Sequence, residues 1–151
     1  MTRLLAILSA ACLLAGCAAP KKSASASAPA SLSEQAELSN TDPCALRLHD
    51  FCGPLLLYFG ANHDIPPDTD ALMQIPGFAD AGPFECPVSH KPYVYNPQGL
   101  PTSNPSLRMI LYDAEPSHRG MRWAVAIQAP REGQPLVAKV IAVPEAQFPK
   151  R

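Results

Sequence analysis

Proline is the residue that most limits how this chain can fold, because 18 of its 151 residues are proline. A proline fixes φ and has no backbone N–H, so it interrupts helix interiors and central strands. The count therefore predicts many turns and loops and disfavours long regular elements. The length suits one domain with appendages.

The overall charge disfavours one class of partner. The formal net charge is −1 at pH 7. Proteins that bind nucleic acids usually carry a basic patch or stripe, and this composition offers no excess of basic residues. We therefore expect no nucleic-acid partner.

The first residues are typical of an export signal. A short positive start at Arg3 is followed by the apolar run Leu4–Leu14. This run is shorter than the about 20 residues that a membrane-spanning helix needs. It ends in Leu14-Ala15-Gly16-Cys17, which resembles the lipobox of bacterial lipoproteins. We expect residues 1–16 to be removed as a lipoprotein signal peptide.

The lipobox resemblance implies a membrane anchor on Cys17. It implies a diacylglyceryl thioether on the thiol and an acyl group on the amine, and we expect no other cofactor. Several acyl chains together hold a protein stably at a bilayer. Ala18 stands where lipoproteins retained at the inner membrane have Asp, so the resemblance implies the outer membrane, facing the periplasm.

A tether separates the anchor from the domain. Residues 18–41 are rich in Ser, Ala and Pro, and they lack large apolar side chains before Leu32. Such a segment buries too little surface to offset its conformational entropy. We expect residues 17–41 to be a lipidated, disordered tether and residues 42–151 to be one α+β domain.

A helix is predicted to open the domain. Asp42 is a good capping residue, and the proline after it suits the first helical position. Apolar side chains follow at helical spacing: Leu48, Cys52, Leu55, Leu56 and Phe59. Pro54 interrupts the pattern, so we expect a kink near Gly53 or two abutting helices. A short second helix over 70–74 is predicted after Asp68.

Four later segments predict antiparallel strands. They cover residues 93–95, 107–112, 122–128 and 136–143, with loops at 96–106, 113–121 and 129–135. Trp123, Val125 and Ile127 alternate on one face of the third strand. A helix followed by such strands predicts an α+β fold, with a kinked N-terminal helix packed on an antiparallel sheet of three to four strands.

Several landmarks follow one another over residues 44–128. They are Cys44-x3-Leu48, Cys86-Pro87, Pro92-Tyr-Val-Tyr95 and Tyr112-Asp-x4-His118. Their order resembles the globular heads of pseudopilin-like, prepilin-type proteins of type II secretion, including the subgroup with a His-x9-Asp-Gly motif. The family's processing site and long polymerising helix are absent, and Gln128 and Ala129 stand where that subgroup has Asp-Gly. The resemblance implies a pseudopilin-like head on a lipid anchor.

Three cysteines remain in the mature domain, in a compartment that we expect to be oxidising. In a continuous helix Cys44 and Cys52 lie about 12 Å apart, which is too far for a bond. Cys86 therefore pairs with one of them. The family resemblance favours Cys44 with Cys86, and Cys52 with Cys86 stays the alternative.

The main functional hypothesis is a non-catalytic structural or protein-binding domain, whose partner is an envelope protein or a secretion-system component. It follows from the anchor, the tether and the lack of a catalytic signature in the sequence. One alternative is metal binding by Cys86-x3-His90 with help from His49, His63 or His118. No metal-binding set is predicted, because the usual paired spacings are missing.

The other alternative is a thiol-dependent periplasmic enzyme. Cys86 would be its nucleophile, with His90 or His118 lowering the pKa of the thiol. Asp113, Glu115 and His118 form a local polar cluster that is equally typical of a solvated turn. We expect no catalytic residues.

A further binding feature is the group Arg119, Arg122 and Trp123. Two guanidinium groups beside an indole could form an exposed patch by cation–π stacking. A single Trp in a strand more often packs in the core, so both interpretations stay open.

Overall fold

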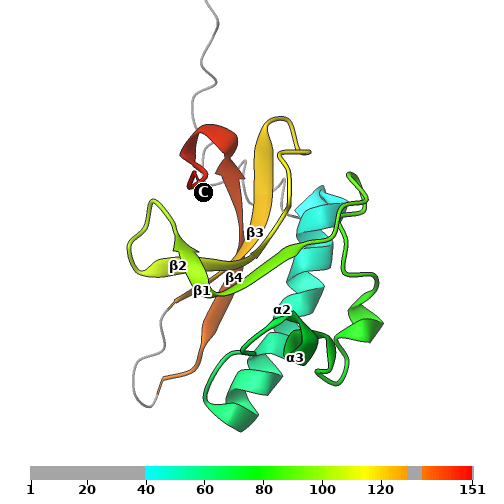
Figure 1. Ribbon diagram of the computed structural model, residues 1–151, viewed down its shortest axis with the longest axis vertical. Helices are drawn as coiled ribbons and strands as arrows, with labels where there is room; N and C mark the ends of the chain where they lie inside the picture. Colours follow the sequence, from blue (N-terminus) through cyan, green and yellow to red (C-terminus); the bar gives the residue numbers. More distant parts are fainter. Residues whose placement is uncertain (1–39, 129–133, 151) are drawn as a thin grey trace, which may run out of the picture.

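The computed structural model describes residues 40–128 and 134–150 (Figure 1). The predicted signal peptide, the Cys17 lipidation site and the tether through residue 39 lie outside the described residues. Along the chain the elements are α2 (Pro43–Asn62), α3 (Thr69–Met73), η1 (Ala79–Ala81), β1 (Val94–Pro101), β2 (Leu107–Tyr112), β3 (Met121–Gln128), β4 (Val137–Pro144) and η2 (Glu145–Gln147).

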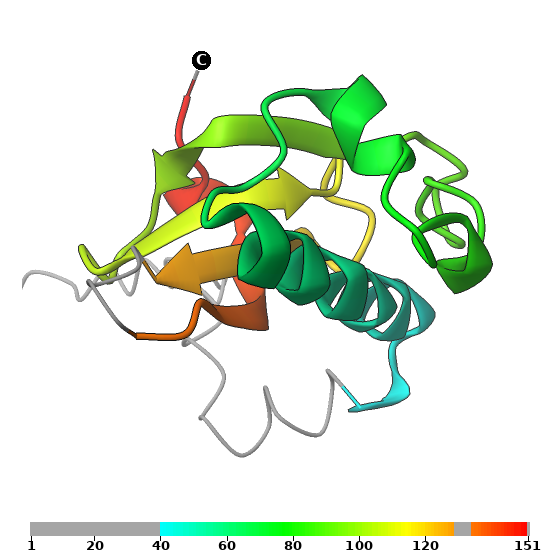
Figure 2. The ribbon, with the colours of Figure 1, turned by 90° about the horizontal axis from the view of Figure 1, so that it is seen from below.

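Within these ranges, four strands form one antiparallel sheet in the order β1-β2-β3-β4. Each strand pairs with the next along the chain, so the sheet is a meander. Helix α2 lies against one face of the sheet, where it contacts β3 and β4 (Figure 2). The predicted α+β class, with a helix packed on an antiparallel sheet, is confirmed.

Helix α2 begins at the predicted capping residue. The Asp42 carboxylate accepts hydrogen bonds through Oδ1 from the N–H groups of Cys44 (2.9 Å) and Ala45 (3.3 Å). The helix is continuous over Pro43–Asn62, with Pro54 inside it. The alternative of two abutting helices is therefore wrong, while a kink at the proline stays a prediction.

The main core lies between α2 and the sheet. Trp123, Val125 and Ile127 of β3 belong to one buried cluster, as their alternation predicted. The same cluster contains Phe51 of α2, which stacks on Phe78 with ring centroids 4.5 Å apart. Burying a side chain of this size stabilises the fold by about 1.5–3 kcal/mol. This core fixes the helix on the sheet.

A bulge in β2 places two consecutive side chains in the main core. Between the paired residues Met109 and Leu111, Ile110 is an extra residue in the ladder. Ile110 and Leu111 both join the main core, whereas Met109 joins a second cluster. In that second cluster Phe148 packs on Tyr112, with ring centroids 5.3 Å apart.

Strand β1 is longer than the sequence predicted. A strand over 93–95 and a loop over 96–106 were expected, but the strand spans Val94–Pro101. Its pairing with β2 is irregular before Leu100. Because β1 is an edge strand, it tolerates Pro97 without losing a buried hydrogen bond.

Candidate functional site

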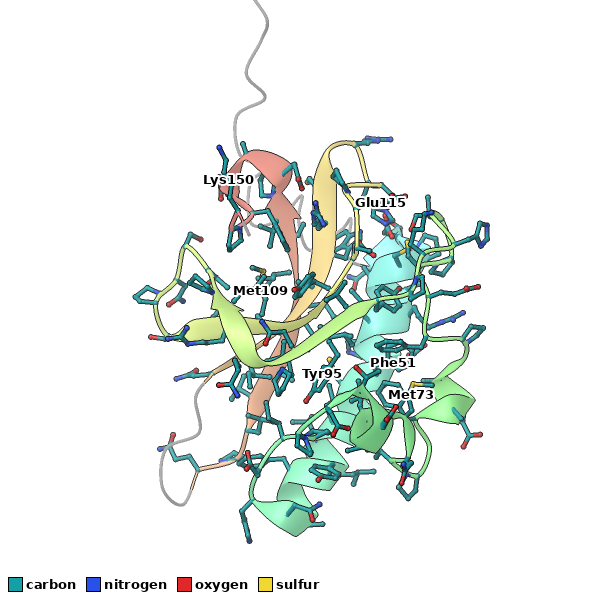
Figure 3. The ribbon with its side chains drawn as sticks, in the orientation of Figure 1. Phe51, Met73, Tyr95, Met109, Glu115 and Lys150 are labelled. Carbon is teal, nitrogen blue, oxygen red and sulfur yellow. A yellow bond between two sulfur atoms is a disulfide. The ribbon has the colours of Figure 1, made fainter. Side chains whose placement is uncertain are left out.

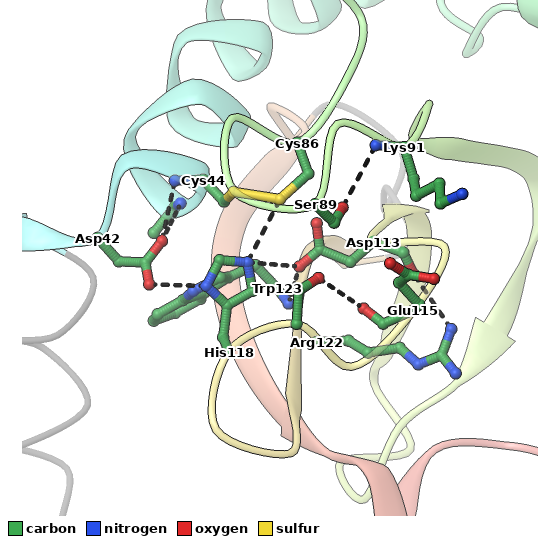
Figure 4. A network of polar contacts seen from close by, with 12 residues as sticks. Asp42, Cys44, Cys86, Ser89, Lys91, Asp113, Glu115, His118, Arg122 and Trp123 are labelled. Atoms are coloured by element: carbon green, nitrogen blue, oxygen red, sulfur yellow. Dashed lines mark hydrogen bonds and ion pairs between the residues drawn. A yellow bond between two sulfur atoms is a disulfide. The ribbon is translucent and has the colours of Figure 1, made fainter.

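A buried polar cluster forms where the start of α2 meets the connection between β2 and β3 (Figure 4). Its members are Asp42, Cys44, Cys86, Asp113 and His118, and we call it the His118 cluster. The start of α2 supplies the first two, and the segment before β1 supplies Cys86. The β2–β3 connection supplies the other two, so residues up to 76 positions apart meet here.

A tight turn holds His118 in place. The N–H groups of His118 and Met121 each donate to the carbonyl oxygen of the other residue, at 3.3 and 3.0 Å. Arg119 and Gly120 between them have φ values of 55° and 78°. Two positive φ values in succession are typical of type I′ hairpin turns. His118 itself is buried, with 7% of its surface exposed.

The imidazole ring of His118 contacts three groups. Its Nδ1 lies 2.9 Å from Oδ2 of Asp42, which is a good hydrogen-bond distance. Its Nε2 lies 3.4 Å from Sγ of Cys86 and 3.5 Å from Oδ2 of Asp113. The ring is therefore fixed on one side by a carboxylate and faces a sulfur and a second carboxylate on the other.

Asp113 is a fully buried carboxylate. Its Oδ2 accepts a 2.7 Å hydrogen bond from the N–H of Trp123. Burial raises the pKa of Asp113 from its ordinary 3.8 to about 6, although the Trp123 N–H and the charge of His118 act in the opposite direction. Among the described residues, nothing pairs with its Oδ1. The cluster thus contains an unsatisfied acceptor, which is costly in a protein interior.

The structure contains a disulfide between Cys44 and Cys86, with Cα atoms 5.4 Å apart. This is the pairing that the family resemblance favours, and Cys52 is the free cysteine of the described chain. The Cys52 thiol donates to the carbonyl of Leu48 at 3.4 Å, and burial raises its pKa to about 11. A disulfide sulfur is not a thiolate, so in this state Cys86 is not a nucleophile.

The four histidines that the sequence suggested as possible metal ligands do not lie together in the structure. His49, His63 and His90 are exposed, and only His118 lies beside the cysteines in the described part of the chain. The backbone N–H of His90 donates to the carbonyl of Cys86 at 2.8 Å, and His90 has a φ of 54°. The Cys86-x3-His90 spacing is therefore a turn, and His90 contributes its backbone to it.

Asp42 was not expected from the sequence to join this cluster, and Glu115, which was expected there, is absent from it. The local pattern marked Asp42 as a helix cap, and no local pattern indicates a contact with a residue 76 positions away. Glu115, which was grouped with Asp113 and His118, is exposed to solvent. The sequence predicted Asp113 and His118 as neighbours, and the family resemblance paired Cys44 with Cys86, but nothing indicated that Asp42 joins them.

The proposed patch of Arg119, Arg122 and Trp123 is not assembled. Trp123 is 2% exposed because it faces the main core from β3. Arg122 pairs instead with Glu145, with 2.7 Å between Nε and Oε2, and its guanidinium lies 4.3 Å from the ring centroid of Phe148. The cation–π partner of Arg122 is therefore a phenylalanine near the C-terminus.

A second feature is a groove of about 700 Å³ beside the C-terminal half of α2, which we call the α2–β1 groove. Its lining includes Tyr58, Ile65, Pro66, Pro97, Gln98 and Arg108. The hydroxyl of Tyr95 donates to the carbonyl of Pro66 at 2.6 Å. Tyr95 belongs to β1 and its hydroxyl reaches the segment after α2, so this bond joins two segments that line the groove (Figure 3).

In the described part of the chain, no helix is long and apolar enough to cross a bilayer. No protein-family model, no curated protein and no solved structure matches this chain.

Proposed function

We propose that this protein is a lipoprotein of the bacterial envelope, anchored through Cys17, whose domain binds a segment of another envelope protein without catalysing a reaction. The lipobox and the residue after it support the outer membrane, facing the periplasm, as its location. The order of landmarks in the domain supports a pseudopilin-like head, for which a secretion-system component is a suitable partner. The α2–β1 groove is the observation that carries the binding role.

The chemistry of the groove suits a polypeptide. Its lining includes Ile110 and Ile127 of the sheet, together with Tyr58 and Pro66. Binding sites of this size are mostly apolar, with a few polar groups that orient the ligand. Arg108, an exposed residue of the lining, supplies such a group. We expect the groove to take an apolar side chain together with the backbone that flanks it.

The His118 cluster supports a non-catalytic role. Both disulfide sulfurs and the Asp113 carboxylate belong to residues with 0% of their surface exposed. A substrate would need to reach within hydrogen-bond distance of these groups, about 3 Å, for them to act as nucleophile or base. A substrate therefore cannot reach these groups of the His118 cluster in the folded domain, whereas the α2–β1 groove is open to solvent.

The anchor is tested by replacing Cys17 with Ser in the full-length chain. The variant should leave the membrane fraction and should lack the mass of the acyl chains, because its hydroxyl replaces the thiol that carries the diacylglyceryl group. Membrane fractionation and intact-mass spectrometry measure both effects. A Cys17→Ser chain that stays with the membrane at the wild-type processed mass contradicts the proposal.

The groove is tested by a photo-crosslinking residue placed at Gln98 in the living cell. We expect one discrete adduct with an envelope protein. Ile65→Lys, which puts a charge into the groove, should abolish it, and circular dichroism checks that the variant stays folded, because Ile65 also packs against the main core. The matched control is Val137→Lys, at an exposed position of β4 outside the groove lining, which should leave the adduct unchanged. An adduct that survives Ile65→Lys, or none at all, contradicts the binding role.

A further inference from the structure

Four residues of the His118 cluster carry atoms of the kinds that bind metal ions, and two of them are joined by the disulfide. Ligand atoms of Cys44, Cys86, Asp113 and His118 all lie within 4.8 Å of one another, and all four residues are buried. We propose that reduction of the Cys44–Cys86 disulfide converts this cluster into a binding site for one Zn²⁺ ion. The disulfide and the metal are then alternative states of the same four residues.

The donor set fits zinc. Zn²⁺ takes four ligands in a tetrahedron, drawn from thiolate sulfur, imidazole nitrogen and carboxylate oxygen, at about 2.0–2.3 Å. Two thiolates favour zinc over magnesium or calcium, which prefer oxygen ligands. On a tetrahedral ion the two sulfurs would lie about 3.8 Å apart. Breaking the S–S bond frees both cysteine side chains to rotate into such positions.

The orientation of His118 is the first independent support. Its Nδ1 is 2.9 Å from the Asp42 carboxylate, so Nδ1 carries the proton that is donated to Asp42. The lone pair of the neutral ring then lies on Nε2, the nitrogen that faces Cys86 and Asp113. Histidines that bind metals almost always donate their other N–H to a carboxylate, a carbonyl or water in this way. Asp42 would therefore be a positioning residue for the metal ligand.

The unsatisfied oxygen of Asp113 is the second support. Oδ1 has no hydrogen-bond partner among the described residues, and the side chain is completely buried. Figure 4 shows this carboxylate beside the disulfide. A buried acceptor without a partner carries a cost that a bound cation would remove. Arg122, whose guanidinium donates to the carbonyl of Asp113, adds positive charge nearby against the three anionic ligands.

The conversion balances with a dithiol as the reductant. The dithiol gives two electrons and two protons, so that its own sulfurs form a disulfide and the Cys44–Cys86 bond becomes two thiols. Zn²⁺ then replaces the two thiol protons, which are released to solvent. Removal of the metal in an oxidising compartment would allow the disulfide to form again.

The test uses the full chain purified in detergent, with Zn²⁺ and Co²⁺ as probes. A phosphine reductant replaces the dithiol, because a dithiol would itself bind zinc. The reduced chain should bind one Zn²⁺ per molecule, and Co²⁺ should give the absorption bands of a tetrahedral site with thiolate ligands. The oxidised chain should bind neither ion. Circular dichroism follows the fold throughout.

Two variants separate the proposed ligand set from general thiol binding. Asp42→Asn keeps a good helix cap, but its amide would donate to Nδ1 and move the ring proton to Nε2. We expect this to weaken zinc binding by about 10–100-fold. Asp113→Asn should weaken it as well and should alter the cobalt spectrum. Cys52→Ser and His90→Ala are the matched controls, and both should bind zinc like the wild type.

Three results would overturn the proposal. The first is a folded, reduced chain that binds no stoichiometric Zn²⁺. The second is zinc binding that depends on Cys52 or His90 and is indifferent to Asp42 and Asp113. The third is a reduced chain that unfolds and is not returned to its folded state by Zn²⁺. None of these outcomes bears on the α2–β1 groove, which is tested by the crosslink.

Discussion

At the scale of single residues, Asp42 connects two parts of the domain through one carboxylate. Oδ1 satisfies two N–H groups at the start of α2, and Oδ2 accepts a hydrogen bond from His118. Losing a helix cap costs about 1 kcal/mol, and a hydrogen bond to a charged group contributes about 1.5–3 kcal/mol. The start of the helix and the β2–β3 turn are therefore stabilised together.

The buried carboxylate of Asp113 predicts a specific pH dependence of stability. Its pKa in the folded chain is raised to about 6, so between about pH 4 and pH 6 the folded state binds more protons than the unfolded state. The contribution of Asp113 to the free energy of unfolding therefore falls as the pH rises through this window. Asp113→Asn should remove this fall.

Denaturant unfolding at pH 4, 5, 6 and 7 measures the effect. We expect the free energy of unfolding of Asp113→Asn, relative to wild type, to increase by up to about 3 kcal/mol between pH 4 and pH 7. Asp80→Asn removes an exposed carboxylate and serves as the control, with little change. A relative stability that is independent of pH, or that decreases, would show that burial does not dominate at Asp113.

The sequence identified most residues of the His118 cluster as candidates, but it did not predict how they come together in space. Asp113 and His118 are close in the sequence, so a shared polar cluster was expected. The disulfide pairing came from a resemblance, because the spacing of the cysteines left two choices. The approach of Asp42 depends on how α2 packs against β3, and tertiary packing of this kind leaves no periodic signal in one sequence.

At the scale of elements, α2 contains both a glycine and a proline in its middle turns and still spans 20 residues. Its buried side chains, among them Leu48, Phe51 and Leu55, explain why it persists. Most helical stability in proteins comes from packing an apolar face and not from intrinsic propensity. The helix therefore tolerates residues that an isolated peptide would not.

Gly60 and Gly120 make a matched pair for testing backbone effects. A Cβ atom at either position would meet nothing within 4 Å, but Gly120 has a φ of 78° and Gly60 is helical. Gly60→Ala should raise the free energy of unfolding by up to about 1 kcal/mol, because Ala has the higher helix propensity. Gly120→Ala should lower it by about 1 kcal/mol or more, because its left-handed turn disfavours a side chain.

Thermal and denaturant unfolding of the two single variants give these values directly. The opposite signs are the important result, since both substitutions add the same methyl group into open space. Equal effects of the two variants would mean that the backbone conformation of the turn beside His118 does not matter.

The strands show which signals a sequence carries. The alternation of Trp123, Val125 and Ile127 predicted both the strand and its buried face. The second half of β1 was missed, because Pro97 and the glycine that follows are typical of loops. An edge strand lacks one pairing partner, so it accepts residues that a central strand would exclude. Local composition does not reveal whether a strand lies at an edge.

At the scale of the whole molecule, the Cys44–Cys86 disulfide joins the helical layer to the segment that leads into the sheet. The two cysteines are 42 positions apart. In the chain-entropy model a loop of this length gives a stabilisation of about 4 kcal/mol. This is a large share of the 5–15 kcal/mol that is typical of a single domain.

Replacing both disulfide cysteines with Ala should therefore lower the free energy of unfolding by about 4 kcal/mol under oxidising conditions. Chemical denaturation of the full chain measures the loss. Cys52→Ala, which removes a buried but unbonded thiol, should cost clearly less and is the control. If the two variants lose the same stability, the bond contributes no more than the packing of one cysteine.

The position of the disulfide also decides how the domain responds to mechanical force. Cys44 is the second residue of α2, at the end of the domain that would face the proposed anchor. A pull on that chain could unravel no more than the residues before Cys44 and would then load a covalent bond. In a chain anchored as we propose, tension from the bilayer would thus pass directly to the segment before β1, and α2 would stay helical for as long as the Cys44–Cys86 bond remains closed.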